Sequence, residues 1–283
     1  MLGICYLVLC FGVGYTVCTL AFPGLNRVAK KSFSGAELGL SDLFVKLPAW
    51  FVTGTMLVSW TVYIFACIFA NSEDPLKIAD TAAFIIWSVI AAVGIFYIVK
   101  KEKNGGIISE IKALKIYEIE IMAAVLVLAA VLMYTSFVVK DHQIYVGFSV
   151  FSDFTPHISM IRSFSFMHNF PTQYSVTAGG DVKYHFMFTF LTGNLEYLGL
   201  RIDNAFNIPS VLGLFGAFSC LYALAAKITG KRAVGVVAIT LFGFRSSFAL
   251  VYYMASLPVG ERLKALFNGT DFIGITNHED WGL

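Results

Sequence analysis

Charged side chains are scarce in this sequence. Asp, Glu, Lys and Arg make up 13% of the 283 residues, against about 25% in soluble domains, and hydrophobic residues reach 58%, against about 45–50%. A globule of this length cannot bury such an excess, so the lipid bilayer must act as the solvent for much of it. This balance excludes an ordinary soluble protein. The formal net charge of +2 points to no acidic partner, and nucleic acid is not expected as one.

Cysteine is also sparse, and its placement excludes two further classes of protein. All five cysteines lie in apolar runs, where a thiol behaves as a small hydrophobic group. Neither a disulfide framework nor the spacing of a metal site is present. We also find no tandem repeat, no low-complexity tract and no separate soluble domain in the sequence.

The long apolar runs predict an all-α, polytopic transmembrane protein with about six spans. Each run is long enough to cross about 30 Å of hydrocarbon as a helix that rises about 1.5 Å per residue. We expect three N-terminal spans within residues 1–116 and a second membrane module over 117–283. The six expected spans are 1–22, 48–70, 81–99, 119–139, 207–227 and 233–255.

The basic residues predict how the spans are oriented. Three segments, 24–47, 100–115 and 227–232, together hold twelve of the twenty Lys and Arg residues. The positive-inside bias makes these segments cytoplasmic. The expected location is therefore the plasma membrane, in a multi-pass arrangement with the N-terminus and the loop 140–206 outside.

The expected external loop, 140–206, is the longest polar interruption in the chain and contains four of the five histidines. Residues 184–200 are apolar but marginal in length for a span. Because the flanking basic segments allow no net crossing between 140 and 206, we expect residues 184–200 to form an interfacial or re-entrant helix.

A second helix is expected in this loop over residues 154–168. Ser152, Asp153 and Thr155 are good N-cap types, and a proline such as Pro156 is tolerated in a first turn. A helix that begins here places Asp153, His157 and His168 on one face. Arg162 falls close to the opposite side.

Three interpretations of this face remain open. Asp153 could act only as a helix cap, with His157 and His168 on a wet loop. Asp153 could instead be a general base that His157 orients. A divalent metal ion shared by Asp153 and His157 is the third interpretation, although two ligands underdetermine a metal site.

Further polar groups lie on the expected helix 184–200. His185, Thr189, Thr192 and Glu196 recur at steps of four, three and four, which predicts a narrow polar stripe. At membrane depth such a stripe faces protein or a water-filled cavity, and on an interfacial helix it faces water.

Arg245 falls near the middle of the last expected span. A guanidinium group there is a candidate ligand for an anionic group, and phosphate suits its geometry. The alternative is a shifted span, from which Arg245 reaches the membrane interface.

The run SDFTPH at Ser152–His157 and the turn NFPTQYSVTAGGDVKYH that ends at His185 resemble the C-type glycosyltransferase superfamily (GT-C), and more narrowly its uncharacterised bacterial multi-spanning members. The resemblance begins at about residue 117, so the first three spans lie outside it. It implies an enzyme that moves a sugar from a polyprenyl-phosphate donor to an acceptor at the outer membrane face.

By this resemblance Asp153 would be the base, assisted by His157, and a divalent metal ion is a possible cofactor. Direct displacement would invert the anomeric configuration, because no second carboxylate nucleophile is evident. The second acidic motif of some members is matched at most by Glu279 and Asp280. The expected substrate-binding residues are Arg162, His168, Tyr184, His185, Glu196 and Arg245.

Two rival functions stay open. In a transporter or channel subunit, Asp153, His157, His185 and Glu196 would form an ion path. In a non-catalytic scaffold, Asp153 would have no chemical role. Because the sequence ends in the interrupted run NHEDWGL, we also expect it to be the N-terminal portion of a longer polypeptide.

Overall fold

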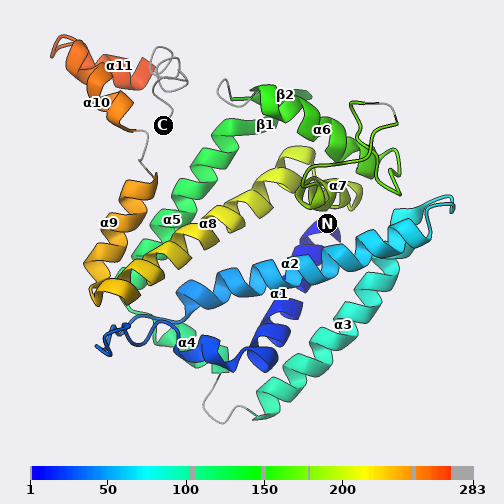
Figure 1. Ribbon diagram of the computed structural model, residues 1–283, viewed down its shortest axis with the longest axis horizontal. Coiled ribbons are helices and arrows are strands. Elements are labelled where there is room, and N and C mark those ends of the chain that lie inside the picture. Colours follow the sequence, from blue (N-terminus) through cyan, green and yellow to red (C-terminus); the bar gives the residue numbers. More distant parts are fainter. Residues whose placement is uncertain (1, 102–105, 148–150, 178, 244–246, 269–283) are drawn as a thin grey trace.

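The computed structural model describes residues 2–101, 106–147, 151–177, 179–243 and 247–268 (Figure 1). It confirms the all-α membrane architecture, because five of its helices are long and apolar enough to cross a bilayer. These five are α1 (Leu2–Ala21), α2 (Leu43–Ile68), α3 (Pro75–Lys101), α5 (Ile116–Ser136) and α8 (Ile202–Thr229).

The other elements are short. The expected sixth span, 233–255, falls on two helices, and residues 244–246 between them lie outside the described residues. The short elements are the 3-10 helix η1 (Pro23–Arg27), α4 (Gly106–Lys112), β1 (Phe137–Lys140), β2 (Gln143–Val146), α6 (Phe151–Ser165), α7 (Met187–Tyr197), α9 (Arg232–Gly243), α10 (Ser247–Ser256) and α11 (Arg262–Asn268).

The three basic segments meet at one end of the helix bundle. The ammonium group of Lys46 lies 2.6 Å from a carboxylate oxygen of Glu110, which ties α2 to α4. The ammonium group of Lys227, at the end of α8, donates to the carbonyl oxygen of Val28 over 2.6 Å. The three basic segments therefore lie together, as the predicted alternation requires, and the assignment of this end to the cytoplasm stays a prediction.

The chain between α5 and α8 lies at the opposite end and contains a β-hairpin that the sequence analysis missed. The expected span 119–139 ends as a helix at Ser136, and β1 then pairs antiparallel with β2, Phe137 opposite Val146. Asp141 and His142 form the turn with φ values of 51° and 62°. Positive φ at both positions is typical of a two-residue hairpin turn, and Asp and His are among the residues that tolerate it.

A buried carboxylate joins this hairpin to α8. Asp203 is fully buried, and its Oδ2 accepts the backbone N–H of Val139 at 2.9 Å. The same carboxylate accepts two hydrogen bonds from Arg201, at 2.6 and 2.7 Å. The hairpin is therefore held by a charge-assisted network as well as by its own ladder.

We expect Asp203→Ala to destabilise the folded protein by about 1.5–3 kcal/mol, the usual range for hydrogen bonds to a charged group. Most of the loss comes from the hydrogen bond with the part-buried N–H of Val139, because Arg201 is 54% exposed and water screens its pairing. Thermal unfolding in detergent measures the effect. Asp181→Ala is the control, since Asp181 is exposed; equal losses in the two variants would contradict the role of Asp203.

Helices α1 and α2 pack closely enough for their backbones to touch through glycine. A Cβ atom built on Gly14 would lie 1.7 Å from the carbonyl oxygen of Trp50, and one on Gly54 would lie 1.7 Å from that of Cys10. Small residues allow this approach between membrane helices, where close van der Waals contact drives association.

Helix α7 does not fit the interfacial alternative expected for residues 184–200, and the re-entrant alternative stays a prediction. Its central residues, from Thr189 to Leu195, are all buried, and α6, α8, α1 and α2 all pack against it. The hydroxyl groups of Thr189 and Thr192 donate to backbone carbonyls one turn earlier, at 2.7 and 3.0 Å. Thr189 and Thr192 of the predicted polar stripe are therefore buried in protein, whereas His185 precedes the helix and is exposed.

Candidate functional site

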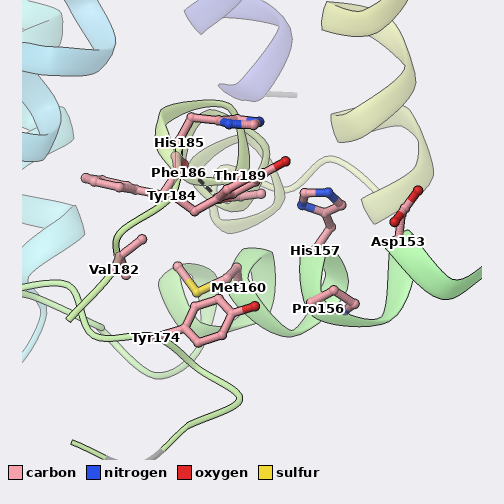
Figure 2. A pocket seen from close by; sticks show the side chains of 10 residues that line it. All are labelled: Asp153, Pro156, His157, Met160, Tyr174, Val182, Tyr184, His185, Phe186 and Thr189. Carbon is pink, nitrogen blue, oxygen red and sulfur yellow. Dashed lines mark hydrogen bonds between the residues drawn. The ribbon is translucent and has the colours of Figure 1, made fainter. Parts of the chain in front are cut away.

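A cavity of about 210 Å³ lies at the loop end of the bundle, between α6, the segment before α7 and the first turn of α7 (Figure 2). Four of the predicted site residues line it, and they come from two places in the sequence. Asp153 and His157 come from α6, and Tyr184 and His185 come from the segment before α7. The remaining lining residues are Pro156, Met160, Tyr174, Val182, Phe186 and Thr189.

Asp153 and His157 share one face of α6, as their four-residue spacing predicts. The chain is already helical at Phe151, so Asp153 lies in the first turn of the helix and the expectation of a cap at this residue is wrong. The first turn of a helix favours a carboxylate through the helix dipole. The Asp153 side chain is exposed and, within the part of the chain that the structure describes, makes no hydrogen bond or ion pair. Its carboxylate is therefore available to a ligand.

The aromatic groups beside Asp153 form one wall of the cavity. The ring centroids of His157 and Tyr184 are 6.3 Å apart, and those of Tyr184 and His185 are 3.8 Å apart. Figure 2 shows the His157 imidazole between Asp153 on one side and Tyr184 on the other. The wall combines a carboxylate, two imidazoles and a phenol, which can all exchange hydrogen bonds with a polar ligand.

His168 does not join this group, so the predicted three-residue face is wrong at this position. Helix α6 ends at Ser165, and His168 follows it with a φ of 48°. This left-handed conformation turns the chain away from the helical course, so the spacing of eleven residues from His157 no longer places the two rings on one face.

Arg162 and Glu196 pair with each other away from the Asp153 cavity. A guanidinium nitrogen of Arg162 lies 3.3 Å from Glu196 Oε1, and the hydroxyl of Ser165 donates to Glu196 Oε2 at 2.8 Å. Neither Arg162 nor Glu196 lines the cavity; Arg162 lines a second hollow of about 550 Å³. The pair links α6 to α7. The substrate-binding role predicted for Arg162 and Glu196 is therefore not located at the Asp153 cavity.

The segment that carries Tyr174 to His185 is held in place at its base. The side-chain amide of Asn169 donates to the carbonyl of Gln173 at 2.7 Å, and its oxygen accepts the N–H of Gln173 at 2.9 Å. The hydroxyl groups of Thr172 and Tyr63 lie 2.9 Å apart, which links the segment to α2. The wall of the cavity is therefore positioned by contacts with the bundle.

Two predicted features lie outside the described residues. Arg245, the proposed phosphate ligand, falls within 244–246, and Glu279 and Asp280 fall within 269–283. Their predicted roles stay predictions. Among the described residues, no cluster of three or more His, Cys, Asp or Glu side chains could hold a metal ion.

The sequence analysis missed the apolar half of the cavity. Met160 follows His157 by three residues and so returns to the same face of α6, a signal that helical periodicity carries. Tyr174 and Val182 reach the cavity through the fold of the loop, which no local pattern predicts. No match to this chain is found among models of protein families, curated proteins or solved structures.

Proposed function

We propose that this protein is a membrane glycosyltransferase that moves a sugar from a polyprenyl-phosphate donor to an acceptor hydroxyl group. The observation that carries the proposal is the available carboxylate of Asp153 beside His157, in a cavity at the end of an apolar helix bundle. A general base of this kind needs a carboxylate within reach of the acceptor.

The proposed reaction is a single displacement. The Asp153 carboxylate takes the proton of the acceptor hydroxyl, and the acceptor oxygen forms a bond with the anomeric carbon. The bond between that carbon and the phosphate oxygen breaks, and polyprenyl phosphate leaves with the bonding electron pair. The configuration is inverted, because the acceptor attacks from the face opposite the phosphate.

The size and lining of the cavity suit the reacting sugar alone, without the lipid chain of the donor. Its volume of about 210 Å³ is below the roughly 300–1,000 Å³ that encloses a drug-sized ligand. We infer that the sugar occupies the cavity next to Met160 and Phe186 while the lipid chain stays in the bilayer. Arg162 is already paired with Glu196, so Lys183, which is exposed between two lining residues, is the better candidate for contact with the phosphate.

The proposal includes the orientation predicted by the basic residues. The end of the bundle with Lys46 and Lys227 would face the cytoplasm, and the cavity would lie at the outer face of the plasma membrane. A lipid-linked donor presents its phosphate and sugar at that interface.

The test is a transfer assay in membranes that contain the protein, with a panel of radiolabelled polyprenyl-phosphate sugars. We expect label to move from one donor to a lipid, glycan or protein acceptor in the wild type and not in Asp153→Asn at matched expression. Transfer of no donor by the wild type would contradict the proposed function and direct the next measurement to ion flux.

A further inference from the structure

A buried carboxyl group lies on α3, far from the chemistry proposed for Asp153. Asp80 is 4% exposed, and its Oδ1 accepts a hydrogen bond at 3.0 Å from the side-chain amide of Asn194 on α7, which is fully buried. Since α3 begins at Pro75, Asp80 lies inside the helix, one residue before the expected span 81–99. The pair therefore joins a long apolar helix to the short helix below the cavity.

Two oxygen atoms of this pair are buried without a partner. Asp80 Oδ2 and Asn194 Oδ1 are both inaccessible, and neither has a hydrogen-bond partner in the part of the chain that the structure describes. A buried polar atom without a partner is costly, and an ionised carboxylate without a countercharge is more so. The two orphan atoms are both acceptors, so what the pair lacks is one hydrogen-bond donor.

The groups around Asp80 supply no positive charge. Helix α1 contributes Tyr6, whose hydroxyl lies 3.1 Å from that of Ser59 on α2 and also interacts with Asn194. Among the described residues no Lys, Arg or His forms an ion pair with Asp80.

The turn before α3 adds a like charge. Asp74 acts on Asp80 electrostatically, and its own Oδ2 accepts the hydroxyl of Tyr197 on α7 at 2.7 Å. Burial and the Asp74 carboxylate raise the pKa of the Tyr197 hydroxyl, so Tyr197 is a neutral donor that Asp74 already occupies. Tyr197 is therefore not the donor that the pair lacks.

We propose that Asp80 and Asn194 form a buried proton-binding site that joins α3 to α7. A proton on Asp80 Oδ2 removes the uncompensated charge and provides the donor that Asn194 Oδ1 lacks. A carboxylic acid and a carboxamide can then exchange two hydrogen bonds in place of one. Release of the proton breaks one of these bonds and leaves an uncompensated charge between α3 and α7.

Binding of this proton makes the stability of the folded protein depend on pH in a predictable direction. An aspartate in the unfolded chain ionises near pH 4, so above that pH the folded state holds a proton that the unfolded state has released. Stability then falls as the pH rises, until the folded state also releases the proton. Over this window the folding equilibrium constant changes by up to about tenfold per pH unit.

The experiment uses the purified full chain in detergent, with infrared difference spectra and thermal unfolding recorded across a pH series. We expect the wild type to show the C=O band of a protonated carboxyl group at neutral pH, Asp80→Asn to lack it, and the exposed control Glu73→Gln to keep it. Because asparagine supplies an N–H where the protonated acid supplies an O–H, Asp80→Asn should fold and lose the pH-dependent part of the stability.

Three results would overturn the proposal. The first is identical carboxyl bands in the wild type and Asp80→Asn at neutral pH. The second is failure of Asp80→Asn to fold, because a neutral side chain of the same shape should be accepted. The third is a rise in thermal stability on replacing choline with sodium at equal ionic strength that Asp80→Asn abolishes, which would assign the site to a metal cation. None of these results depends on transfer activity.

Discussion

Asp153→Asn is expected to lower the rate of sugar transfer by at least about 100-fold, because it removes the general base and keeps the shape of the side chain. Asp153 is exposed and has no side-chain partner among the described residues, so the variant should fold as the wild type does. The initial rate of label transfer in membranes, with each variant at matched expression, measures the effect.

The matched control for this prediction is Asp181→Asn. Asp181 is an exposed carboxylate on the segment that forms the cavity wall, yet it does not line the cavity. We expect it to keep a rate close to that of the wild type. Equal rates for Asp153→Asn and the wild type would remove Asp153 from the chemistry, and equal losses in both aspartate variants would indicate a general effect of charge at the loop.

The helices of the membrane bundle could be predicted from the sequence, because the bilayer imposes a simple rule on it. A span needs about 20 apolar residues in succession, and α1, α2, α5 and α8 each satisfy this locally. The basic residues then predict which ends lie together, and the contact between Lys227 and Val28 bears this out. Asp153 and His157 were paired correctly for the same reason, since a four-residue step is a local property of a helix.

The rest of the loop depends on turns and contacts that no local pattern reveals. His168 leaves the face of His157 because a single residue takes a positive φ after Ser165. The hairpin after Ser136 depends on Asp203, about 60 residues away in the sequence, whose carboxylate holds the edge at Val139. Periodicity carries no information about either event.

The environment of helix α7 likewise depends on packing that its local sequence does not reveal. Its composition suits an interfacial helix, but Gly193 lets it approach α6 so closely that a Cβ there would lie 2.6 Å from the carbonyl oxygen of Ile161. This approach brings Asn194 to Asp80 and Glu196 to Arg162. Glu196, which the sequence predicts to face water or substrate, thus pairs with Arg162 and Ser165 on α6 instead.

Gly14→Ala and Gly54→Ala are each expected to destabilise the folded protein by at least about 3 kcal/mol, the upper part of the usual cost of overpacking. The added methyl group meets the backbone of the other helix at 1.7 Å, at Trp50 in one case and at Cys10 in the other. A backbone carbonyl cannot rotate out of the way as a flexible side chain can, so α1 and α2 must separate. The midpoint of thermal unfolding in detergent reports the loss.

The chain supplies a control for this prediction on the same helix, two residues away. A Cβ on Gly12 would have only Ala91 near it, at 3.9 Å, which is ordinary contact. Gly12→Ala gains helix propensity without a clash, so we expect it to keep or raise the midpoint by the equivalent of up to about 1 kcal/mol. If Gly14→Ala unfolded at the same temperature as Gly12→Ala, the two helices could not cross as closely as described, and the placement of α1 against α2 and α7 would need revision. A much lower unfolding temperature for Gly14→Ala than for Gly12→Ala would instead locate the tightest contact of the bundle at Gly14 and Gly54.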